Sequence, residues 1–146
     1  WTHNKRLVEK HWEEQFHAPL ASKLDEMLLT NPRDSSPILE SLQALGVVAF
    51  RRHEALEIPR HLILISDLLQ NSGGYSQYSG PSTFADFRKS AQYLKTRAEL
   101  QGVKAEVWYV RRDGAQRAQG RTHVLFWEEY FRDAGAELTR VKSVEG

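Results

Sequence analysis

Asp67 is the acidic side chain that the sequence places best for chemistry. It directly follows the apolar run Leu62–Ile65, and Ser66 and Asn71 lie close to it in the chain. In open parallel sheets ligands bind beyond the carboxyl ends of the strands, so an acid at such an end is a candidate nucleophile, general base or metal ligand. An Asx turn that caps the following residues is the structural alternative for the same side chain.

A hydroxyl group could join Asp67 from the start of the preceding helix. Ser36 stands before Pro37, a pattern typical of a helix N-cap followed by proline at the first helical position. A helix that enters a parallel sheet has its N-terminus on the side where the strands end, so we expect Ser36 and Asp67 to converge. Such oxygen ligands suit magnesium, but two of them are too few for its octahedral shell.

The loop that follows Asp67 offers residues for contact with a partner. It runs from Gln70 to Ser82 and contains Asn71, Tyr75 and Tyr78. Amphipathic tyrosine rings in a polar loop often contact a partner protein, although a loop folded back onto its own tyrosines is equally compatible with the pattern. We therefore expect these three residues to bind a partner and keep the second interpretation open.

A second loop on the same side of the sheet is basic. Arg111 and Arg112 open it, and Arg117 and Arg121 follow. These side chains could attract an acidic partner, or they could be ordinary solvated cations.

Other kinds of site are excluded or unsupported. The chain has no cysteine, which removes disulfides, thiolate metal sites and cysteine nucleophiles. Its six histidines form no His-Glu-x-x-His pattern, and it has neither a Gly-x-Ser-x-Gly elbow nor a P-loop. A formal charge of +1 over 146 residues does not favour a nucleic-acid partner.

The location of the protein cannot be read from the sequence. No apolar run is long enough to cross a bilayer, and we expect no membrane contact from this segment. The chain is expected to be a soluble segment, either cytoplasmic or the soluble part of a membrane-tethered protein.

Helices and strands alternate along most of the chain. Apolar residues at spacings of three and four predict helices over Lys5–Leu29, from Ile38 to about residue 50, from Phe84 to Ala98 and from about Val124 to Phe131. Apolar and β-branched runs predict strands near 61–66, 104–110 and 136–143. Because Leu62–Ile65 is apolar without alternation, we expect that strand to be covered on both faces.

This order predicts an α/β fold in which helices flank a parallel sheet as a three-layer sandwich. The 146 residues suit a single domain, 1–146, and the helix over Lys5–Leu29 is expected to cover the sheet.

The Ser36 and Asp67 segments together resemble the C-terminal two-thirds of a von Willebrand factor type A-like domain. The loop Ser35-Ser36-Pro37 precedes Leu42-Gln43-Ala44-Leu45, and Ile65-Ser66-Asp67 closes a strand. In that family these two segments hold a divalent cation with an Asp-x-Ser-x-Ser motif on the first strand. That motif is absent here, and Leu68 replaces the glycine that commonly follows the aspartate. The resemblance implies an N-terminally truncated domain in which upstream residues would have to complete a magnesium site on Ser36 and Asp67.

The resemblance also implies a protein-protein interaction module rather than an enzyme. The partner would be another protein or the missing N-terminal segment of the same protein. One alternative is a small α/β enzyme that uses Asp67 as nucleophile or general base, together with Ser36 or an arginine of the 111–121 loop. Another is a scaffold whose exposed edge beside Leu62–Ile65 accepts a strand from a partner.

Overall fold

The computed structural model describes residues 35–50, 58–80 and 82–144, together with positions 7, 10, 11, 14, 18 and 22. The chain divides into two compact units, residues 1–32 with residue 146, and residues 33–145. All elements named below belong to the second unit, and the single domain over 1–146 stays a prediction. The helix over Lys5–Leu29 and its contact with the sheet lie mostly outside the described residues, although Leu7, Lys10 and His11 are helical.

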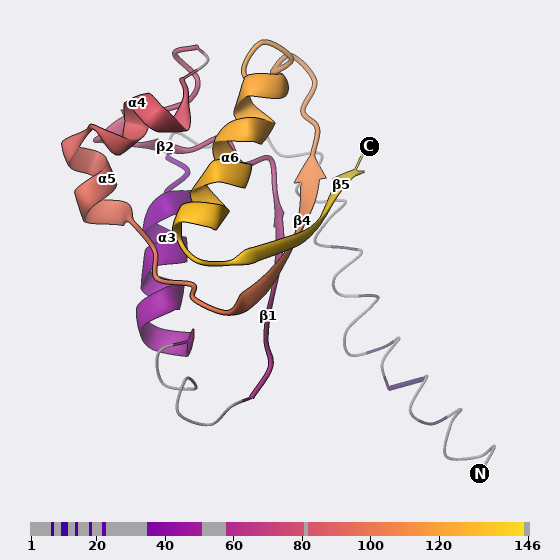
Figure 1. Cartoon of the computed structure of the whole chain (residues 1–146). Coiled ribbons are helices and arrows are strands. Elements are labelled where there is room, and N and C mark those ends of the chain that lie inside the picture. Colours follow the sequence, from indigo (N-terminus) through magenta and orange to yellow (C-terminus); the bar gives the residue numbers. More distant parts are fainter. Residues whose placement is uncertain are drawn as a thin grey trace. The chain divides into compact units, whose positions relative to one another are not determined.

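The second unit contains a parallel sheet of three strands in the order β1-β4-β5 (Figure 1). The strands are β1 (Arg60–Ser66), β4 (Val103–Val110) and β5 (Glu137–Val144). Leu64 of β1 pairs with Val107 of β4, which pairs with Val141 of β5. The predicted α/β class with a parallel sheet is therefore confirmed.

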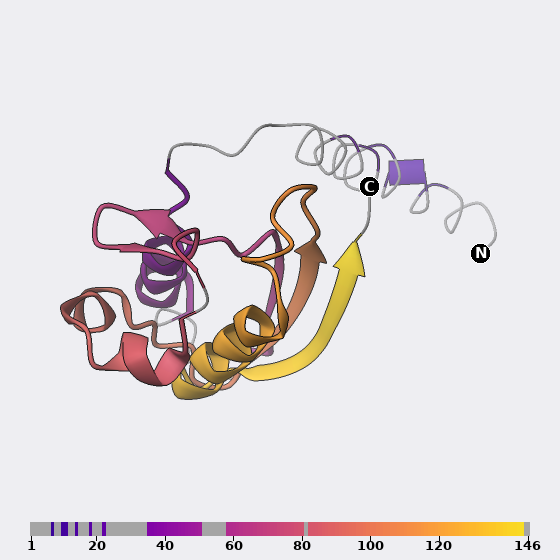
Figure 2. The ribbon, with the colours of Figure 1, turned by 90° about the horizontal axis from the view of Figure 1, so that it is seen from above.

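The described helices lie to one side of this sheet (Figure 2). They are α3 (Ile38–Leu45) with the π-helical turn η2 (Gly46–Phe50), α4 (Phe84–Arg88), α5 (Ala91–Thr96) and α6 (Arg121–Asp133). Helices α4 and α5 connect β1 to β4, and α6 connects β4 to β5.

The core fills the space between the helices and the sheet. Odd-numbered residues of β4 are buried towards the helices, because side chains of a strand alternate between its faces. Aromatic rings dominate the rest of this core, and its largest buried members are Phe84, Phe87, Tyr93, Phe126, Trp127, Tyr130 and Phe131.

The other face of the sheet is more open than the sequence predicted. Ile63 of β1, which pairs with Glu106 on this face, is 55% exposed. Trp108 of β4 is half-buried, its indole N–H donates to Glu106 at 2.8 Å, and the Lys142 ammonium lies 5.2 Å from its ring centre. In the described ranges, helices therefore cover one face of β1 (Figure 2), whereas the sequence predicted cover on both faces.

Two local predictions were wrong. The single helix expected from Phe84 to Ala98 is two helices, because the Ser90 hydroxyl accepts a hydrogen bond from the Tyr93 backbone and caps a new helix. Leu94, part of the apolar spacing that predicted this helix, is 73% exposed. The polar loop after β1 also contains a short antiparallel hairpin, β2 (Asn71–Ser72) and β3 (Tyr75–Ser76).

Candidate functional site at the carboxyl end of the sheet

Asp67 follows β1 and forms an ion pair with Arg112, which lies in the loop after β4. The Arg112 Nε donates to the Asp67 Oδ2, and the Leu69 backbone N–H donates to the Oδ1 at 3.0 Å. The two charged side chains are 10% and 20% exposed. Both carboxylate oxygens are therefore engaged, one in the Asx turn that the sequence offered as an alternative and one in anchoring the second loop.

The Gln119 side chain joins the segments that end β1 and β4 through hydrogen bonds to their backbones. Its Nε2 donates to the backbone carbonyls of Asp67 at 3.0 Å and of Val110 at 2.8 Å. Its Oε1 accepts from the Arg112 backbone N–H at 2.8 Å. The side chain is almost completely buried, so these bonds have no competition from water. Sequence reasoning missed Gln119, because nothing in the polar loop distinguishes it from the exposed Gln116.

His123, in the first turn of α6, extends the buried polar network. Its Nε2 lies 3.0 Å from the Leu68 carbonyl, which only accepts, so this nitrogen carries the proton of the neutral ring. The Nδ1 then accepts from the Tyr109 hydroxyl at 2.7 Å. Burial lowers the pKa of His123, and the Leu68 carbonyl and the Asp67 charge oppose that shift. Burial also raises the pKa of Tyr109 to about 12, so its hydroxyl stays a donor.

The lowered pKa of His123 predicts that the fold loses stability in mild acid. The unfolded chain takes up the proton near the ordinary value of 6.5, before the folded chain does. The stabilisation is complete above that pH and is lost as the pH falls towards the lower folded pKa. Urea unfolding between about pH 7.5 and about pH 5.5 should show this fall. His123→Gln should flatten the dependence, and an unchanged slope in that variant would show that other groups cause it.

Tyr78 lies within electrostatic reach of the Asp67–Arg112 pair and is open to solvent. Its side chain is 39% exposed. Burial of the rest of the ring, followed by the nearby Asp67 charge, raises the pKa of Tyr78, and the Arg112 charge opposes the shift. Arg111 is also exposed, with its guanidinium 5.9 Å from the centre of the Tyr109 ring.

The other predicted residues take different places. The backbones of Ser36 and Asn71 bond to each other, N–H to carbonyl, at 2.6 and 2.9 Å, which ties the start of α3 to β2. The Tyr75 ring packs towards the core, with its centre 4.8 Å from that of Phe87 and 6.1 Å from that of Phe126. In this structure the Tyr75 side chain packs against its own domain. Its contact with a partner stays a prediction.

A cation on Ser36 and Asp67 would have to compete with an ion pair that is already present. Asp67 already holds a guanidinium, and a cation beside Arg112 would be repelled. In residues 35–50, 58–80 and 82–144, no group of three or more histidine, aspartate or glutamate side chains could hold a metal ion. The magnesium site therefore stays a prediction that depends on ligands from elsewhere, and no chemical step is derived through it.

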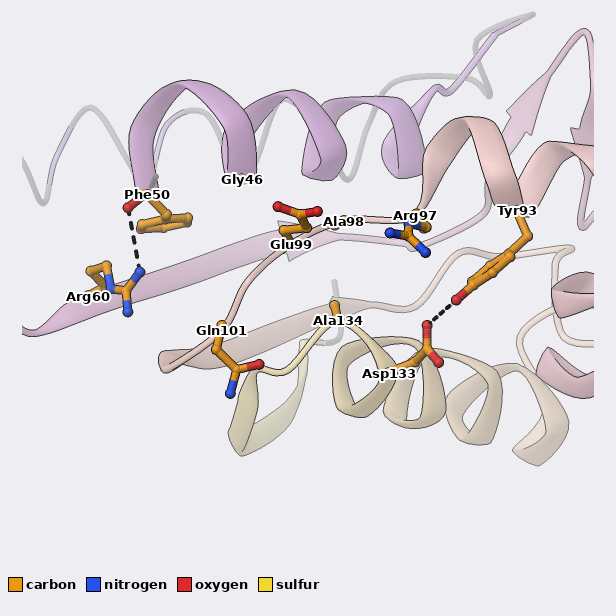
Figure 3. Close-up of a pocket in the computed structure, with 10 residues that line it drawn as sticks. All are labelled: Gly46, Phe50, Arg60, Tyr93, Arg97, Ala98, Glu99, Gln101, Asp133 and Ala134. Carbon is orange, nitrogen blue, oxygen red and sulfur yellow. Dashed lines mark hydrogen bonds between the residues drawn. The ribbon is translucent and has the colours of Figure 1, made fainter. Parts of the chain in front are cut away.

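A polar hollow of about 410 Å³ lies at the opposite end of the strands (Figure 3). The Tyr93 hydroxyl donates to Asp133 at 2.7 Å, and Arg88 lies 3.6 Å from the same carboxylate. The Arg60 Nη1 donates to the Phe50 carbonyl at 3.5 Å. Charges of both signs, Arg60, Arg97, Glu99 and Asp133, line the hollow, so it shows no preference for one class of ligand.

Comparisons with known proteins identify no relative of this chain: family models, curated protein sequences and solved structures all give no match. The part of the chain that the structure describes also contains no helix long and apolar enough to span a membrane. The function must therefore be argued from the geometry of the strand ends.

Proposed function

We propose that this protein is a protein-protein interaction module, of the von Willebrand factor type A-like kind that its Ser36 and Asp67 segments resemble. One observation carries the proposal: Tyr78 lies half in solvent, near enough to the almost buried Asp67–Arg112 pair for both charges to act on its hydroxyl. A half-exposed aromatic ring on a rigid polar base is typical of interface centres, where tyrosine supplies contact area at little entropic cost.

The charges around Tyr78 favour an acidic segment of the partner. Arg111, Arg117 and Arg121 are exposed at the same end of the sheet, whereas Asp67 is covered. Exposed cations of this kind steer an acidic partner and fix its orientation more than they add to affinity. Contact through a bridging magnesium ion would additionally need ligands that the described residues do not provide.

The enzymatic alternative has less support. Arg112 meets the requirement for a group within hydrogen-bond distance of Asp67. A guanidinium remains protonated in proteins, however, so Arg112 can hold the carboxylate but cannot exchange a proton with it. The other group bonded to the Asp67 carboxylate, the backbone N–H of Leu69, cannot exchange a proton either.

An NMR titration with a short polyglutamate peptide tests the proposal. We expect shifts at Tyr78 and Arg111, and about tenfold weaker binding in the double variant Tyr78→Ala, Arg111→Glu. Arg97→Glu, an exposed charge reversal at the opposite end of the strands, serves as the matched control. Equal losses in the control and the double variant would mean that only net charge matters and would refute a specific surface, as would the absence of binding.

A further inference from the structure

The two outer strands of the sheet differ in how well their edges are protected. The β5 edge carries the charged residues Glu137, Arg140 and Lys142, and its pairing with β4 is interrupted by a bulge beside Ala105. Charges and bulges are the usual means by which sheet edges avoid further pairing. The β5 edge is therefore protected against pairing with a further strand.

Within the described residues, the β1 edge from Leu62 to Ser66 has neither form of protection. Among the described strands β1 pairs with β4 alone, through seven residues in regular register. From Leu62 to Ile65 it is aliphatic, without charge, proline or glycine. An open edge with this composition readily pairs with another strand.

An apolar groove of about 390 Å³ lies between this strand and α3. Its aliphatic lining comes from both elements, and none of its lining residues is charged: Ser36, Pro37, Ile38, Ser41, Leu42, Leu45, Leu62, Leu64, Ile65 and Ser66. Leu45 and Leu62, both core candidates by their pattern, are only half-buried because they border this groove.

We propose that the β1 edge and this groove form a slot that accepts one additional β-strand from a partner polypeptide. The backbone of the added strand would pair with Arg60–Ser66, and its alternate side chains would enter the groove against α3. The exposed Ile63 on the other face favours aliphatic residues there too. The partner segment is therefore extended, uncharged and rich in valine, isoleucine or leucine. The slot is a second surface, independent of the Tyr78 surface.

A strand fits the slot better than a second copy of this chain. Two copies that pair antiparallel through β1 would both bring α3 to the same face of the joined sheet. Neighbouring strands are about 4.8 Å apart, whereas packed helices need about 8 to 10 Å. Since α3 already borders the groove beside β1, two such helices would crowd each other, and a bare strand would not.

A synthetic peptide provides the direct test. The probe is a soluble peptide of alternating valine and isoleucine with lysine pairs at both ends, and its control is the same peptide with every core amide N-methylated. We expect the first peptide to bind and to slow amide hydrogen exchange along Leu62–Ser66, and the methylated peptide not to bind. Equal binding of both peptides, or of neither, would overturn the proposal.

Two variants locate the binding in the groove. Leu45→Lys places a charge on the groove wall and should weaken peptide binding about tenfold, and the exposed Ser41→Lys should do the same if Leu45→Lys unfolds. Val48→Lys is the matched control, because Val48 is 64% exposed and lies outside the groove. Analytical ultracentrifugation completes the test: a dimer that Ser41→Lys disrupts would show that a second copy fills the slot, and would overturn the assignment to a partner.

Discussion

Replacing Asp67 with alanine should lower the free energy of unfolding by about 3 kcal/mol. The substitution removes the carboxylate that holds the Arg112 guanidinium, which is only 20% exposed, and it removes the acceptor of the Leu69 N–H. Breaking a largely buried ion pair costs more than the pair contributes, because one charge is left behind. Urea unfolding followed by tryptophan fluorescence measures the change.

A double-mutant cycle shows whether the loss arises from this pair. Arg112→Ala in the Asp67→Ala background should cost less than Arg112→Ala alone, because the two side chains interact directly. Asp113→Ala, which removes an exposed carboxylate from the same loop, should change stability by less than about 0.5 kcal/mol. A more stable Asp67→Ala variant would contradict the structural role, since a carboxylate held for binding or catalysis is usually a source of strain.

Gln119→Leu should also destabilise the fold by about 3 kcal/mol. Leucine keeps most of the side-chain volume but cannot bond to the carbonyls of Asp67 and Val110 or to the Arg112 N–H. Three backbone groups would lose their partner at a site almost closed to water. Thermal and urea unfolding measure the loss.

The neighbouring Gln116 provides the control for Gln119. It lies in the same loop but is exposed, so Gln116→Leu should leave stability almost unchanged. Similar effects of the two substitutions would mean that the loop, rather than the bonds of Gln119, determines stability. In that case the Tyr78 surface would lack the rigid base on which its proposed function rests.

The sequence was sufficient to predict three strands that run parallel, because apolar runs alternating with helices leave few other topologies. It was insufficient where one residue changed the local outcome. From Phe84 to Ala98 the apolar spacing continues without interruption, and only the Ser90 cap reveals the break. Capping depends on backbone geometry, which a hydrophobic pattern does not contain.

The location of the candidate site was predictable from the sequence, but its hydrogen bonds and ion pair were not. A polar residue after an apolar strand indicates the carboxyl end of a sheet, and Asp67 is there. The path of the loop after β4 determines that Arg112, rather than Arg111, turns inward to Asp67. The same path places Gln119 against the Asp67 carbonyl. These contacts join residues 45 and 52 positions apart, beyond the reach of any local pattern.

A magnesium titration followed by thermal unfolding tests most directly the claim that Asp67 anchors a binding surface. Because its carboxylate is engaged by Arg112 and Leu69, magnesium should raise the unfolding midpoint no more than sodium chloride of equal ionic strength. Asp67→Asn should respond in the same way. A midpoint that rises with magnesium in the original chain but not in Asp67→Asn would contradict this account and identify Asp67 as a cation ligand.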